Sequence, residues 1–128
     1  MYNYSIMQYK QQSINTMSNS ELIVKLYEET IKDLTLASKM FNEKNADAAL
    51  VCTQKAKDII KHLGSVLDFH YEISHNLKQL YNFFHMQIVR AEAQLSGELI
   101  DEILPLIIDL KNTWVEAQKI VHINQVGR

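Results

Sequence analysis

The chain has 128 residues, of which 47% are hydrophobic and 22% charged, and its formal net charge is −2. This length is typical of one domain, and the composition excludes a disordered chain. The small net charge argues against a general attraction to nucleic acid. The sequence has no run of 18 apolar residues, and its first ten residues lack the basic and apolar parts of a signal peptide. Since the single Cys52 also fits a reducing compartment, we predict a cytosolic protein that neither enters a membrane nor binds nucleic acid.

Apolar residues recur at helical spacing in four segments, which predicts helices over about residues 19–41, 46–68, 73–95 and 98–121. Ser18 and Glu21 have the spacing of a capping box at the start of the first helix. Similar helix lengths and short connections predict an all-α fold, an antiparallel up-and-down four-helix bundle. We expect this bundle over residues 18–124, preceded by an N-terminal arm of residues 1–17.

The predicted core follows one face of each helix. On the last two helices this face holds Leu77, Tyr81, Phe84, Ile88, Ala91 and Leu95, and then Leu99, Ile103, Ile107, Leu110, Trp114, Ala117 and Val121. Pro105 interrupts the fourth helical pattern, because proline removes a backbone donor from a helix interior. Either the helix is kinked near residues 100–101, or a short helix ends there and a longer one begins near Leu104.

The last two helices carry more apolar residues than one core face needs. Phe83 and Met86 fall on the flank and back of the third helix, and Leu80 lies at its margin. A second stripe of the fourth helix holds Leu104, Ile108 and Val115. Such stripes indicate deeper burial, self-association or a site for another helix. The alternative is a wide core with scattered surface hydrophobic residues.

A metal centre is the third possibility, because Glu72 and His75 have the E-x-x-H spacing of di-iron bundles, with Asp68 and His70 nearby. Di-iron sites need two such motifs and a glutamate from each of two other helices, and this chain has one motif at a helix start. Nucleophile motifs and glycine-rich phosphate loops are absent from the sequence. We therefore predict no metal, no cofactor and no enzymatic activity.

Three blocks of the sequence, in order, resemble the FliS family of flagellar export chaperones. The first block comprises Tyr9, Ile14, Thr16, Ser18, Leu22, Leu26 and Tyr27. The second block comprises Leu67, Asp68, Glu72, Ile73, Asn76, Leu77, Leu80, Tyr81 and Phe83, and the third is Trp114. Met17 and Asn19 depart from the family's usual alanine and proline, and His70 and Tyr71 stand where it often has two glycines.

The resemblance implies a cytosolic chaperone that binds the C-terminal helical region of flagellin, prevents its premature polymerisation and passes it to the flagellar export apparatus. It favours a client-binding role for the apolar stripes, with Leu80, Phe83, Met86, Leu104 and Ile108 as the expected flagellin-binding residues. The N-terminal arm, through Ile6 and Tyr9, is expected to compete for the same surface; the alternative is a disordered tail, because chain ends usually fray. The alternative function is a helical adaptor, or a homodimer that forms through the apolar stripes, without a flagellin client.

Overall fold

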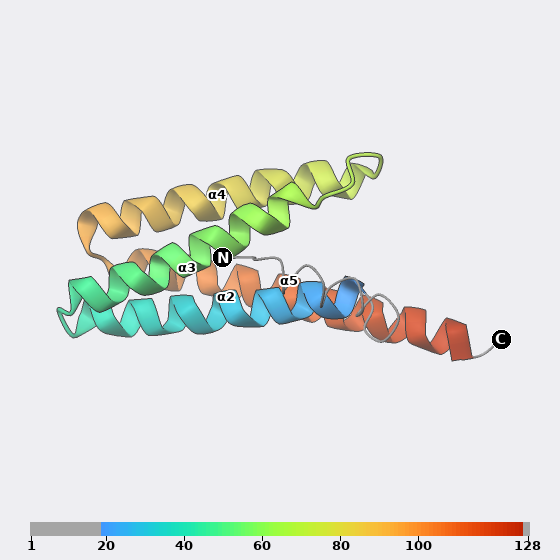
Figure 1. Ribbon diagram of the computed structural model, residues 1–128, viewed down its shortest axis with the longest axis horizontal. Coiled ribbons are helices and arrows are strands. Elements are labelled where there is room, and N and C mark those ends of the chain that lie inside the picture. The colour runs from blue at the N-terminus through green and yellow to red at the C-terminus, as the bar shows by residue number, and fades with distance from the viewer. Residues whose placement is uncertain (1–18, 127–128) are drawn as a thin grey trace, which may run out of the picture.

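The computed structural model describes residues 19–126, which form four helices joined by short connections. Their bounds are Asn19–Asn42 for α2, Ala46–Ser65 for α3, Glu72–Gln94 for α4 and Gly97–Val126 for α5. Successive helices run antiparallel, and each packs against its neighbours in sequence, while α5 also closes the bundle against α2 (Figure 1). The predicted all-α four-helix bundle is confirmed. The arm of residues 1–17, the cap residue Ser18, and the arm residues Ile6 and Tyr9 lie outside the described residues.

Short connections fix the helix ends. Asn45 caps α3, because its side chain accepts a hydrogen bond from the backbone N–H of Ala48. At its other end α3 stops at Ser65, three residues before the predicted end. The chain turns there because Asp68 Oδ1 accepts the backbone N–H of His70, which stabilises a turn in place of further helix. The α3–α4 connection therefore spans residues 66–71.

Most of the predicted core residues are buried. The fully enclosed ones on α4 and α5 include Phe84, Ile88, Ile103 and Ile107. Leu95 is an exception, since its side chain is 53% exposed. It follows the last residue of α4 with a left-handed φ of 52°, and this conformation turns the chain away from the helix axis.

At the far end of α5, Ala117 is exposed and Trp114 is only half-buried, although both were expected to point inward. The side chain of Val121 lies outside the described residues. Ile100, which the predicted core face omitted, is fully buried.

The four helices meet most tightly at one end of the bundle, here called the closed end, which contains the α2–α3 and α4–α5 turns. A Cβ on Gly97 would lie 2.8 Å from the carbonyl oxygen of Ser38, so the start of α5 touches the backbone of α2. The Ser38 hydroxyl donates to Asp101 Oδ1 over 2.7 Å. On α4, Gln87 Nε2 donates to the Leu99 carbonyl over 3.2 Å and to Glu102 Oε2 over 2.6 Å. These bonds join α5 to both of its neighbours.

At the opposite end, here called the open end, α3 and α4 diverge from α2 and α5 (Figure 1). Between the two ends, α5 continues as one helix through Pro105, so the alternative of two separate helices was wrong. Pro105 lies on the exposed side of α5, where water can bond the carbonyl that lost its helical partner.

Candidate functional site: an apolar pocket at the open end

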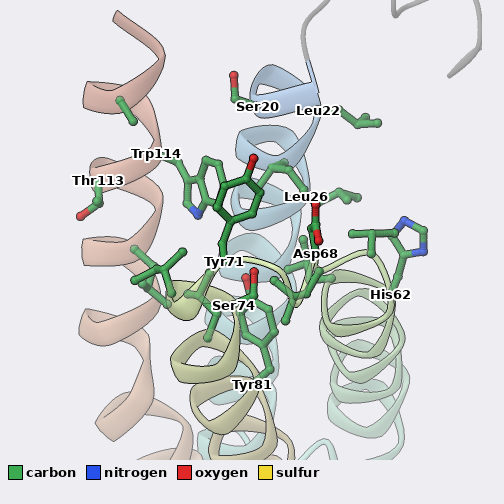
Figure 2. A pocket seen from close by; sticks show the side chains of 18 residues that line it. Ser20, Leu22, Leu26, His62, Asp68, Tyr71, Ser74, Tyr81, Thr113 and Trp114 are labelled. Carbon is green, nitrogen blue, oxygen red and sulfur yellow. The ribbon is translucent and has the colours of Figure 1, made fainter. Parts of the chain in front are cut away.

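An apolar pocket of about 580 Å³ lies where the helix pairs diverge (Figure 2). All four helices and the α3–α4 connection line it. Its residues are Ser20, Leu22, Ile23, Leu26, His62, Leu63, Val66, Leu67, Asp68, Tyr71, Ile73, Ser74, Leu77, Tyr81, Leu110, Thr113, Trp114 and Ala117. A mainly apolar cavity of this size with a few polar groups is typical of a ligand site between helices.

The α3–α4 connection forms one wall of this pocket and is held by two histidines. His70 Nδ1 lies 2.8 Å from Asp68 Oδ1. Hydrogen bonds from the backbone and side chain of His70 lower the pKa of Asp68. His75 Nε2 lies 3.1 Å from the Phe69 carbonyl oxygen, and the ring centroids of His75 and Phe69 are 5.1 Å apart. Tyr71 extends from this connection into the space in front of Trp114 (Figure 2).

Three of the four residues considered for a metal centre, Asp68, His70 and His75, therefore form contacts within the α3–α4 connection or with it. Among residues 19–126, no three histidine, cysteine, aspartate or glutamate side chains come together in a group that could hold a metal ion. The contacts of Asp68, His70 and His75 give these side chains a structural role at the pocket wall.

At the inner end of the pocket, the buried Tyr27 and Tyr81 and the half-buried Trp114 form what is here called the tyrosine–tryptophan cluster. Trp114 Nε1 donates to Tyr27 Oη over 3.2 Å, and the hydroxyls of Tyr27 and Tyr81 are hydrogen-bonded to each other. Burial raises the pKa of both tyrosines, so both hydroxyls keep their protons at neutral pH. The cluster joins α2, α4 and α5 at the point where the helices begin to diverge.

The predicted flagellin-binding residues lie outside this pocket. Phe83 and Met86 on α4 are 48% and 58% exposed, whereas Leu80 is half-buried against the core. On α5, Ile108 is 38% exposed and Leu104 is half-buried. The apolar side chains that the sequence marked as surplus are thus at least partly accessible.

The structure does not bring these five residues into one groove. Phe83 shares a flank of α4 with Gln87, one turn later, and Gln87 contacts α5. Leu104 follows Asp101 by one turn, and Asp101 contacts Ser38 on α2. Phe83, on α4, therefore lies beside the flank of α5 that contacts α4. Leu104 lies on the opposite flank of α5, which contacts α2. Ile108 shares the flank of Leu104, and Met86 points away from the bundle.

Sequence reasoning missed Leu106 and most of the pocket. Leu106 is exposed one turn after Glu102, on the flank of α5 that faces α4. With Leu80, Phe83 and Leu110 it forms what we call the α4–α5 surface. The pocket residues gave no separate signal, because apolar residues that line a cavity have the same helical spacing as core residues.

The fold and pocket define an all-α bundle protein with a preformed apolar site between its helices. Over the part of the chain that the structure describes, none of the helices has the length and apolar character needed to cross a membrane. The family model described as "Flagellar protein FliS" matches residues 1–121, and the chain belongs to this family.

Two relatives carry the name flagellar secretion chaperone FliS. The protein from Bacillus subtilis (strain 168) is 25% identical over 109 residues, which cover 85% of this chain and 82% of that protein. The protein from Vibrio cholerae serotype O1 (strain ATCC 39315 / El Tor Inaba N16961) is 36% identical over 62 residues, or 47% of this chain and 46% of that protein. The resemblance drawn from the three sequence blocks is confirmed.

Proposed function

We propose that this protein is a cytosolic, non-enzymatic chaperone of flagellar export, which binds the C-terminal helical region of flagellin and prevents its premature polymerisation. Two relatives are named as flagellar secretion chaperones, which supports the chaperone role. The observation that carries the binding role is the apolar pocket at the open end, because it offers a client segment a preformed site. The client would then pass to the flagellar export apparatus.

Masking of apolar surface supplies the mechanism. A client helix has an apolar face that would otherwise pack against other flagellin subunits, and this face can be buried against apolar side chains of the bundle. Fully burying one large apolar side chain contributes about 1.5–3 kcal/mol, so a few contacts give useful affinity. The α4–α5 surface offers exposed Phe83 and Leu106 beside the half-buried Leu80.

The two flanks of α5 suggest that the client contacts more than one side of the bundle. Leu104 and Ile108 lie toward α2, whereas Phe83 lies toward the other flank of α5. A single straight helix cannot cover both flanks. We therefore propose that an extended client segment, with more than one helix, contacts both, and that Met86 adds a flexible contact at its edge.

The N-terminal arm is proposed as a competitor for the pocket. Ser20 and Leu22, in the first turn of α2, line the pocket, so the described part of the chain begins beside it. An arm of residues 1–17 can reach any part of a pocket of this size. Ile6 and Tyr9 would supply the apolar side chains, and the client would displace them.

A homodimer or general adaptor is the second candidate function. It is favoured by the α3–α4 connection and the start of α4, where Phe69, Tyr71 and Ile73 expose large apolar surfaces close together in sequence. Such a patch can bind a second copy of the chain as well as a client.

The decisive experiment compares full-length flagellin with flagellin that lacks its C-terminal segment. We expect the full-length protein to co-migrate with the chaperone on gel filtration, and the truncated protein to elute separately. Equal binding of both would contradict the chaperone function and favour a general adaptor. Light scattering of the chaperone alone tests the homodimer.

A further inference from the structure

The tyrosine–tryptophan cluster has more hydrogen-bond donors than it uses. The indole N–H of Trp114 and the hydroxyls of Tyr27 and Tyr81 carry one proton each, and an indole nitrogen can only donate. Two hydrogen bonds join the three groups, and the structure shows no further partner for them among residues 19–126. Three protons and two bonds leave one proton with no acceptor in this part of the chain.

The donor in the bond between Tyr27 and Tyr81 decides which hydroxyl keeps this proton. Trp114 donates to Tyr27 Oη, so either tyrosine could donate in the bond between the two hydroxyls. If Tyr81 donated, the remaining proton would belong to Tyr27, which is 1% exposed and does not line the pocket. A buried donor without an acceptor destabilises the fold. Donation from Tyr27 to Tyr81 is therefore favoured.

This order places the remaining proton on Tyr81, whose side chain is 3% exposed to solvent and lines the pocket. Figure 2 shows the Tyr81 ring with its oxygen directed toward the space among the lining side chains. Each hydrogen bond in such a chain polarises the next, so the Tyr81 hydroxyl becomes a stronger donor. A mainly apolar pocket thus contains one strong, directed donor at its inner end.

We propose that Tyr81 Oη donates a hydrogen bond to a carbonyl oxygen of the segment that occupies the pocket, so that Tyr81 sets the specificity of the site. This inference rests on the proposed function, in which the occupant is a client segment. The last four carbonyls of a helix lack helical partners, and asparagine and glutamine side chains carry a carbonyl as well. The pocket would then favour a helix end or an amide side chain over a purely apolar insertion.

Two small probes of nearly equal shape test this selectivity without flagellin. Acetophenone carries a carbonyl oxygen, and α-methylstyrene has a methylene group in its place. Binding to the full-length chain is followed by NMR through the indole N–H resonance of Trp114, which is unambiguous because the chain has one tryptophan. The measured quantity is the ratio of the two affinities.

We expect Tyr81→Phe to lower the acetophenone to α-methylstyrene affinity ratio by roughly two- to tenfold, which is the range for one hydrogen bond. Tyr27→Phe is the matched variant, because it also removes one hydroxyl from the cluster but keeps the hydroxyl of Tyr81. Its ratio should stay closer to that of the wild type. An unchanged ratio in Tyr81→Phe, or an equal fall in both variants, would overturn the proposal.

A measurement on the wild type covers the case in which Tyr81→Phe does not fold. With tyrosines labelled at the ring carbon that bears the hydroxyl, acetophenone should shift the Tyr81 resonance more than α-methylstyrene does. Equal shifts would overturn the proposal. Because neither probe involves flagellin, these results remain separate from flagellin binding, and failure of the wild type to bind flagellin would contradict the proposed function alone.

Discussion

Lys57 Nζ on α3 lies 2.8 Å from Glu92 Oε1 on α4, and the second carboxylate oxygen of Glu92 accepts a 2.7 Å hydrogen bond from Thr53. The side chains of Lys57 and Glu92 are 15% and 17% exposed, so little water screens the pair. The Lys57–Glu92 pair lies near the α4–α5 turn and joins α4 to α3, whereas the nearby Gln87 joins α4 to α5. The second half of α4 is thus held on both sides, while its first half forms a wall of the pocket.

We expect Glu92→Ala to lower the free energy of unfolding by about 2–3 kcal/mol, because it leaves the Lys57 ammonium without its partner in a largely buried place and removes the hydrogen bond from Thr53. Urea unfolding followed by circular dichroism measures the change. Glu116→Ala is the control, since Glu116 pairs with Lys119 at the surface. An equal loss in both variants would show that the α3–α4 bridge contributes no more than an exposed pair.

For the exposed apolar residues of α4, we predict that Phe83→Glu combined with Met86→Glu weakens flagellin binding by at least about a hundredfold while the fold remains intact. Both side chains are about half-exposed, and two buried apolar contacts are worth roughly 3 kcal/mol or more. Calorimetric titration with flagellin gives the affinity. Val51→Glu is the control, because Val51 is equally exposed on α3. Unaltered affinity in the double variant would remove these residues from the client site.

The opposite flank of α5 is tested by Ile108→Glu. If the client contacts both flanks, this change should weaken flagellin binding by roughly tenfold, since it replaces one partly exposed apolar contact by a charge. The same calorimetric titration measures it. Full affinity would confine the client to the side of α5 that faces α4.

Deletion of residues 1–12 tests the arm. If the arm covers the pocket most of the time, client affinity is reduced by the fraction of molecules that are open, and deletion should tighten binding several-fold. The exposed pocket should also increase self-association in light scattering. The variant Ile6→Ala with Tyr9→Ala should act in the same direction. Weaker binding after deletion would instead indicate an arm that closes over bound client.

The stability of the bundle should depend on pH through Asp33, a largely buried carboxyl on α2. Burial and then the charge of Glu29 raise its pKa, and Lys55 and Lys32 offset part of this effect. Because the pKa of Asp33 is raised in the folded state, its protonated carboxyl contributes fully to stability at pH values below the unfolded-state pKa of about 3.9. This contribution is lost as the pH rises through the folded-state pKa. Ionised Asp33 is therefore unfavourable at neutral pH.

We expect Asp33→Asn to raise the melting temperature at pH 7 relative to the wild type, and to have a less favourable effect at pH 3, where both side chains are neutral. Thermal unfolding at the two pH values measures the difference. An effect of Asp33→Asn that is the same at both pH values would show that ionisation of this carboxyl does not limit stability.

The fold could be predicted from the sequence because each helix has its own apolar periodicity and polar turn. Tyr27, Phe84 and Ile107 are buried as that periodicity requires. The end of α3 was less predictable, because the bond from His70 to Asp68 that forms the turn leaves no periodic signal. Leu95 was misplaced for a similar reason, since its left-handed backbone takes it off the helical pattern.

The pocket could not be predicted, because it depends on how far the helices diverge and not on which residues face inward. Leu77 and Tyr81 were correctly placed on an inner face, yet that face lines a cavity as well as a core. The bond between Tyr27 and Trp114 joins residues 87 positions apart in the sequence, and helical spacing says nothing about such pairs. Exposed Phe83 and Met86 could be identified because they break the single-stripe pattern of a surface helix.

Pro105 separates the part of α5 that is bonded to α2 and α4 from the part that lines the pocket. Residues before it are locked at the closed end through Gly97, Asp101 and Glu102, whereas residues after it supply Leu110 and Trp114 to the pocket. Proline removes one backbone hydrogen bond of the helix between these parts, and prolines are common sites of helix kinks. A bend at Pro105 would therefore move Leu110 and Trp114 and change the width of the pocket, while the bonds of Asp101 and Glu102 to the neighbouring helices could stay in place.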